Sequence, residues 1–183
     1  MRLMLSSSFA NAFLGGLAVW AFLSVGGILV WAAVIAWGCF FHAGGDNNAV
    51  RITVVGNCLG ILTAWIAGIL LTLNPVAIPP PLWAGSVVGL LTFAMVFIGH
   101  QLATHAGLTI RVIPASFYGA AATFAYIVQT PDRLTTRALF SMSFDNALIA
   151  LPISMFIGAL LGLATAKMTV ALATPSTRAG VAR

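Results

Sequence analysis

The sequence predicts an all-α protein, a polytopic transmembrane helical bundle of about six segments. Hydrophobic residues make up 61% of the chain and charged residues only 6%, whereas soluble domains carry about 25% charged residues. The apolar runs are continuous, as in residues 85–99, and they lack the alternation of polar and apolar residues found in membrane β-strands. Because backbone groups in lipid must be bonded internally, such runs indicate helices.

The predicted spans follow from the breaks in the apolar runs. The 183 residues provide about six spans of roughly 20 residues and leave no room for a separate soluble domain. The apolar stretch 9–41 is too long for one span, and Gly26 and Gly27 predict a tight turn within it. Segment two is therefore short, as is segment five. The segments are expected at about residues 6–23, 28–41, 50–73, 82–103, 113–129 and 147–166.

The loops between these segments differ in character. Residues 42–48 form a polar loop, whereas residues 74–81 contain four prolines and no charge, which predicts a stiff, extended connector. Residues 130–146 form the longest and most polar loop. We therefore expect one transmembrane domain over residues 1–173 and a flexible tail at residues 174–183.

The basic residues predict how the chain is oriented. With six spans, Arg133 and Arg137 fall on one side of the membrane, and the other six Lys and Arg residues fall on the opposite side. Cytoplasmic loops carry the excess of basic residues, so both termini are expected in the cytoplasm. Residues 1–12 resemble a signal peptide, but the apolar stretch continues to residue 41, which favours a retained first span.

The polar residues disfavour several classes of function. Asp46, Asp132 and Asp145 all lie in predicted loops, so a transporter coupled through an intramembrane carboxylate is disfavoured. No nucleophile stands beside a base, and we expect neither an enzyme nor a cofactor. The scattered basic residues form no nucleic-acid patch. His100 and His105 are five residues apart, whereas helical metal ligands are better placed four apart, so no metal site is expected.

Glycines recur at a four-residue spacing in three segments. This spacing puts both glycines on one helix face and lets a neighbouring backbone approach closely. We expect these faces to be helix contacts, within the protomer or between subunits, or alternatively to line a pathway. A homo-oligomer fits either alternative. The pairs are Gly56 with Gly60, Gly85 with Gly89, and Gly158 with Gly162.

Segment five also carries a recognisable motif. Residues 114–125 read Pro-Ala-Ser-Phe-Tyr-Gly-Ala-Ala-Ala-Thr-Phe-Ala, which resembles the Pro-x-Ser/Thr-Phe-x-Gly-Ala-x-Ala-Thr-Phe-Ala stretch of a bacterial inner-membrane family catalogued as domain of unknown function 1097. Looser similarity covers most of the remaining chain, including Trp37-Gly38-Cys39 and the glycine-rich last span. The resemblance implies a compact inner-membrane protein of several spans. It implies no activity and no site residues.

Segment five supplies most of the candidate functional residues. Pro114 can stand in the first turn of a helix, and the small residues behind it include Ser116, Gly119 and Thr123. Short segments at matching places in two halves point to a transport site in an inverted repeat. Segments two and five fit this pattern, and the chain is therefore interpreted as a 3+3 inverted repeat. Half-helices and closely packed full spans both agree with the sequence.

Two polar residues outside segment five complete the candidate set. Asn57 lies within segment three, where an amide needs a partner or a wet cavity. It would line a pathway or form a hydrogen bond between helices. His100 ends the apolar run of segment four, where it would guard the mouth of a pore or mark the head-group boundary.

These observations lead to two hypotheses of function. The first is a channel or facilitator for a small neutral or weakly polar solute, lined by Asn57 and the candidate residues of segment five, with His100 near one mouth. The absence of buried charge motivates it, because such a path needs shape and a few hydrogen-bonding groups. The second is a non-transporting membrane scaffold or accessory subunit, motivated by the glycine-spaced faces. In both, the lipid bilayer is a partner.

Overall fold

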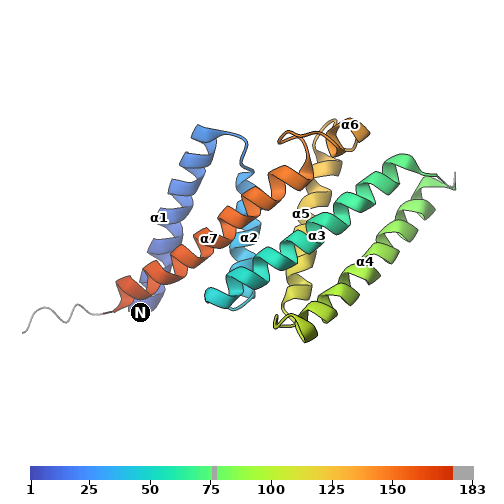
Figure 1. The fold of residues 1–183 in the computed structure, drawn as a ribbon. Coiled ribbons are helices and arrows are strands. Elements are labelled where there is room, and N and C mark those ends of the chain that lie inside the picture. The colour runs from blue at the N-terminus through green and yellow to red at the C-terminus, as the bar shows by residue number, and fades with distance from the viewer. Residues whose placement is uncertain (76–77, 175–183) are drawn as a thin grey trace, which may run out of the picture.

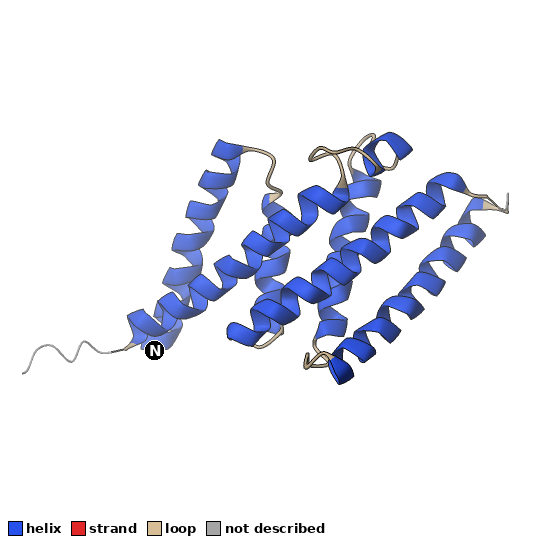
Figure 2. Cartoon of the chain, in the orientation of Figure 1, coloured by secondary structure: helices blue, strands red, loops and turns tan. Residues whose placement is uncertain are grey.

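The computed structural model describes residues 1–75 and 78–174. Over these residues the chain forms helices joined by loops and turns, without strands (Figures 1 and 2), which confirms the predicted helical bundle. Apart from Thr174, the predicted tail lies outside the described residues. The helices are α1 (Arg2–Val25), α2 (Val30–His42), α3 (Asn47–Leu73), α4 (Pro80–His105), α5 (Val112–Gln129), α6 (Thr136–Leu139) and α7 (Ala147–Ala173).

The apolar helices run up and down alternately. Five of them, α1, α3, α4, α5 and α7, are long and apolar enough to cross a membrane. Helix α2 is apolar but has only 13 residues, as the short second segment predicted. Helix α6 is a four-residue turn in the loop before α7. Because the six apolar helices alternate in direction, the start of α1 and the end of α7 lie at the same end of the bundle (Figure 1).

The helix boundaries lie near the predicted ones but extend beyond several apolar runs. Helix α1 begins at Arg2 and α7 ends at Ala173, at least a turn outside the predicted segments 6–23 and 147–166. Intrahelical hydrogen bonding continues until a cap or turn interrupts it, and it does not depend on hydrophobicity. The predicted turn between α1 and α2 is present, with Gly26 at φ 73° and Gly27 at φ 75°.

The two halves of the bundle repeat the same helix contacts. Helix α3 packs along α5, and α7 packs along α2. In the same way, α4 lies against α3, and α1 lies against α7. Exchanging α1, α2 and α3 with α4, α5 and α7 therefore maps one set of contacts onto the other, with the α3–α7 contact at the centre. Three helices per half give the halves opposite directions, in agreement with the predicted 3+3 inverted repeat.

Glycines allow α3 and α5 to pack backbone against backbone. A Cβ added at Gly60 would lie 2.6 Å from the backbone nitrogen of Ala120. From the other side, a Cβ added at Gly119 would lie 2.7 Å from the Cα of Asn57. Real side chains do not approach backbone this closely, so the contact requires glycine at both positions. We call this contact the α3–α5 seam.

The same arrangement recurs between α7 and α2. A Cβ added at Gly158 would lie 2.7 Å from the backbone carbonyl carbon of Ala33, and one added at Gly162 would lie 2.6 Å from a ring carbon of Phe40. Two of the three predicted glycine pairs are therefore helix contacts within the protomer.

The outer helices α1 and α4 have open surfaces. A Cβ added at Gly85 or Gly89, the third pair, would have no heavy atom of the described chain within 4 Å. Nearby on α4, Leu90 is 70% exposed and Phe93 is 72% exposed. Large apolar side chains with this exposure suit contact with lipid tails.

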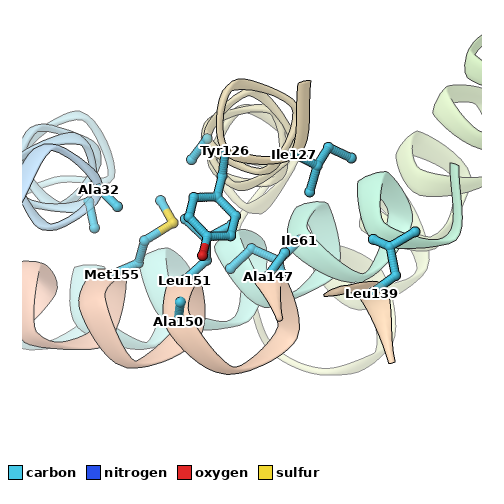
Figure 3. Close-up of a cluster of buried hydrophobic side chains, with 11 residues drawn as sticks. Ala32, Ile61, Tyr126, Ile127, Leu139, Ala147, Ala150, Leu151 and Met155 are labelled. Atoms are coloured by element: carbon cyan, nitrogen blue, oxygen red, sulfur yellow. The ribbon is translucent and has the colours of Figure 1, made fainter. Parts of the chain in front are cut away.

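The centre of the bundle is an apolar cluster at which α2, α3, α5 and α7 meet (Figure 3). Tyr126 extends from α5 toward Ala150 and Leu151 of α7 (Figure 3). Its hydroxyl donates a hydrogen bond to the carbonyl oxygen of Phe144 at 2.8 Å. This bond connects the core to the loop at residues 130–146.

Candidate functional site

Four of the six predicted site residues lie in the α3–α5 seam. Asn57 of α3 and Ser116, Gly119 and Thr123 of α5 are all buried. The hydroxyls of Ser116 and Thr123 donate to carbonyl oxygens of their own helix, at 2.7 Å and 2.8 Å respectively. Such bonds satisfy a hydroxyl inside a membrane helix. These residues pack between two helices, and they do not form the walls of the larger cavities described below.

The other two predicted residues lie apart from this group. Pro114 is partly buried in the first turn of α5, the place that its missing N–H predicts. His100 is exposed on α4, and its Nδ1 lies 3.0 Å from the carbonyl oxygen of Val96 in the preceding turn. Within the described chain, no hydrogen bond connects His100 to the seam.

Asn57 has a polar side chain without a partner. The residue is 2% exposed, and neither Oδ1 nor Nδ2 has a hydrogen-bond partner among the described residues. Asn57 lines a cavity of about 10 Å³ together with Pro152 of α7, which is about the room that one water needs. Pro152 has no N–H, so the carbonyl of Leu148 one turn earlier has no intrahelical donor. The unpaired amide of Asn57 and the proline that interrupts the α7 hydrogen-bond ladder thus line the same cavity.

A larger cavity lies on a neighbouring face of α5. It has a volume of about 240 Å³ and is bounded by α3, α4 and α5. We call it the α3/α4/α5 cavity. Its lining is small or apolar and uncharged, with Thr63 and Thr92 as the residues that carry hydroxyls. The Thr63 hydroxyl donates to the carbonyl oxygen of Leu59 at 2.8 Å, and its own oxygen can still accept a hydrogen bond.

Sequence reasoning did not find this cavity. It selected the face of α5 that carries Ser116 and Gly119, whereas the cavity is lined by Phe117, Ala121 and Phe124. Both faces contain small residues, so composition alone could not distinguish them. The available signal was the spacing of the two phenylalanines, seven residues or about two turns apart on one helix face.

A second cavity lies between the outer helix and the short helix of the other half. It has a volume of about 350 Å³ and lies between α1 and α2, where its lining includes Asn11 and Trp37. Since α1 corresponds to α4 and α2 to α5, the two cavities lie between corresponding helices, but α3 also lines the first cavity whereas α7 does not line the second. The indole N–H of Trp37 is buried without an acceptor among the described residues. This cavity is also uncharged.

The comparisons with known proteins address the family of the chain. A family model described as "Protein of unknown function (DUF1097)" matches residues 9–170. The chain belongs to this family. The match covers all six apolar helices of this DUF1097 protein, in whole or in part, and confirms the resemblance found in segment five. Searches of curated proteins and of solved structures found no match. The family description assigns no activity, so the geometry of the bundle must support any functional conclusion.

Proposed function

We propose that this DUF1097 protein is a facilitator for a small neutral or weakly polar solute. The observation that supports the proposal is the α3/α4/α5 cavity of about 240 Å³, which lies at the middle turns of three spanning helices. A pathway for an uncharged solute needs a suitable shape and a few hydrogen-bonding groups, and it needs no ion ligands. Thr63 and Thr92 supply such groups in an otherwise apolar wall. No enzymatic step is part of the proposal.

The repeat gives the proposal a second element. Each half has an uncharged cavity between its outer helix and its short helix. Transport sites in inverted repeats lie near the bilayer midplane, at the interface between the repeats. We propose that the solute passes from one cavity to the other when the bundle opens beside the α3–α7 contact, where the space is now only about 10 Å³ and Asn57 provides an unpaired amide. The bundle would lie in a bacterial inner membrane with both termini in the cytoplasm, as the distribution of basic residues favours.

Flux through proteoliposomes tests this function. Glycerol and urea are suitable neutral probes, followed by light scattering after rapid mixing. Ala121 lines the cavity and is exposed, so Ala121→Trp should fill the cavity without disturbing the α3–α5 seam. We expect this variant to lower the probe flux to that of protein-free liposomes. A substitution at Gly119 would be less informative, because it would also push α5 away from α3.

Leu90→Trp provides the matched control. Leu90 lies on α4, is 70% exposed and does not line the cavity. The Leu90→Trp variant carries the same aromatic side chain outside the cavity. We expect its probe flux to equal that of the unaltered protein. Equal flux in empty liposomes, in liposomes with the unaltered protein and in those with Ala121→Trp would reject the facilitator.

The open face of α4 favours a second candidate, a non-transporting subunit that packs against another copy or another membrane protein. A Cβ added at the glycines of α3 and α7 would meet neighbouring backbone or side chains, whereas one added at Gly85 or Gly89 would meet no heavy atom of the described chain within 4 Å. This face would suit a second helix. In a Cys58→Ala background, Gly85→Cys should then form a disulfide-linked dimer in membranes, and Leu73→Cys at the exposed end of α3 should not. A monomeric Gly85→Cys band would remove support for pairing through α4.

A further inference from the structure

The loop between α5 and α7 is fixed in place by hydrogen bonds to the bundle. The indole N–H of Trp65 donates to the carbonyl oxygen of Leu139 at 2.9 Å. The hydroxyl of Tyr126 donates to the carbonyl oxygen of Phe144 at 2.8 Å. Both donors come from spanning helices, so the loop is anchored to α3 and α5. The backbone of the loop is therefore held at this end of the bundle.

This loop encloses a polar pocket of about 430 Å³. Two guanidinium groups and two carboxylates line it, from Asp132, Arg133, Arg137 and Asp145. Arg133 forms an ion pair with Asp145 at 2.6 Å. Among the described residues, neither Asp132 nor Arg137 takes part in an ion pair. The lining is therefore neutral as a whole, but it presents one carboxylate and one guanidinium that are not paired with each other.

The backbone holds these two unpaired charges apart. Asp132 has a φ of 61°, a left-handed conformation that aspartate tolerates. The Thr135 hydroxyl donates to the carbonyl oxygen of Asp132 at 3.1 Å and accepts from the N–H of Ala138 at 3.2 Å. The second bond caps α6, the turn that carries Arg137. These bonds order the backbone between the two residues, whose exposed side chains line one pocket without forming an ion pair with each other.

The same loop exposes large apolar side chains. Phe140 is 56% exposed, Met142 is 94% exposed and Phe144 is 45% exposed. Aromatic and apolar side chains at the end of a span insert into the interface between head groups and acyl chains. The pocket lies where α5 and α7 reach this end of the bundle. Its occupant is therefore expected at head-group level, next to lipid.

We propose that this pocket binds the head group of a zwitterionic phospholipid that carries a primary amine. Arg137 would bind the phosphodiester, because guanidinium groups form strong charge-assisted hydrogen bonds with phosphate. Asp132 would bind the ammonium group. A lipid with a phosphate but no amine would satisfy Arg137 and leave Asp132 facing a negative charge. The charge pattern of the pocket therefore selects a phosphate and an amine together.

Lipid retention by the purified full-length protein tests the proposal. The protein in detergent is titrated with phosphatidylethanolamine or with phosphatidylglycerol, and bound lipid is counted by native mass spectrometry. We expect the unaltered protein to bind phosphatidylethanolamine more tightly, by about 1.5- to 5-fold, the range of one exposed ion pair. Equal affinity for the two lipids would overturn the proposal.

Two substitutions have different expected outcomes. Arg137→Gln should weaken binding of both lipids, because both carry a phosphodiester. Asp132→Asn should weaken phosphatidylethanolamine and strengthen phosphatidylglycerol, since it removes the carboxylate that repels an anionic head group. A merely structural role for Asp132 would lower both affinities together. Arg2→Gln, which removes a guanidinium at the opposite end of the bundle (Figure 1), is the control and should change neither affinity.

A soluble competitor distinguishes the lipid from a free zwitterion. Glycerophosphoethanolamine has the same phosphate and amine but no acyl chains. We expect it to displace phosphatidylethanolamine only at concentrations far above that of the lipid. Displacement at equal concentrations would reject the lipid as occupant and identify the pocket as a site for a soluble zwitterion.

Discussion

Gly119 of α5 lies directly against the backbone of Asn57 of α3, so that a Cβ added at Gly119 would come within 2.7 Å of the Asn57 Cα. Membrane helices gain little from hydrophobic burial against each other, and close backbone packing replaces that driving force. The most specific stretch of the sequence thus forms part of a packing contact between two central helices.

Gly119→Ala should destabilise the bundle. The added methyl would overlap the α3 backbone, and overpacking of this kind typically lowers the free energy of unfolding by about 1–3 kcal/mol. Gly85→Ala is the matched control, because no atom of the described chain lies within 4 Å of its Cβ position. Thermal unfolding in detergent, followed by circular dichroism, should show a lower midpoint for Gly119→Ala alone. An unfolding midpoint equal to that of the unaltered protein would mean that the α3–α5 seam has room for a methyl group at residue 119.

Gly60→Ala and Gly158→Ala should have similar effects. Gly60 meets the backbone of α5, and Gly158 meets the backbone of α2 in the other half. If the halves are equivalent, both substitutions should lower the unfolding midpoint by comparable amounts in the same assay. A large loss for one and none for the other would show that the two contacts are not equivalent in energy.

Asn57→Leu should stabilise the protein. The Asn57 amide is buried without a partner among the described residues, and an unsatisfied buried polar group costs about 1–3 kcal/mol. Leucine has a similar size and needs no partner, so the unfolding midpoint should rise. The conservative control Asn57→Gln keeps the amide and should not raise it. A lower midpoint for Asn57→Leu would indicate that the amide is bonded in the membrane, through water for example.

Asn146→Ala should loosen the loop at residues 130–146. The Asn146 Oδ1 accepts from the N–H of Leu148 at 2.9 Å, and its Nδ2 donates to the carbonyl oxygen of Ser141 at 3.0 Å. Loss of a helix cap usually costs about 1 kcal/mol. We expect faster hydrogen exchange in the loop and in the first turn of α7. Asn11→Ala removes an exposed amide of α1 and should leave exchange in the loop unchanged; equal exchange in both variants would contradict the role of Asn146.

Much of the fold was predictable because it depends on length and hydrophobicity. The apolar runs placed the spans, and the turn at Gly26 and Gly27 separated α1 from the short α2. Helix ends were less predictable, since hydrogen bonding carries α7 past Lys167 to Ala173. The sequence also gave no sign of α6, a single turn capped by the hydroxyl of Thr135.

The candidate site was predicted only in part. The sequence analysis grouped Asn57 with Ser116, Gly119 and Thr123, and in the structure these three residues share one buried stretch of α5. The packing of α4 determines which face of α5 borders a cavity. The spacing of residues along the sequence does not predict the contact between α4 and α5. The role of these residues in a pathway stays a prediction. The cavity between α1 and α2 likewise depends on contacts between residues far apart in the chain. The loop pocket is lined by residues within 132–145, and its shape depends on how the loop folds.

The brevity of α2 has a consequence for the surrounding bilayer. Its 13 residues extend about 20 Å, whereas the hydrocarbon layer is about 30 Å thick. Val34 and Phe41 are 54% and 43% exposed and line the cavity between α1 and α2. Where lipid reaches α2, local thinning of the bilayer is one way to match the length of this helix, and it would bring the two leaflets closer together. The protein should therefore prefer short-chain lipids, and a molecule that crosses beside α2 would traverse a thinner barrier.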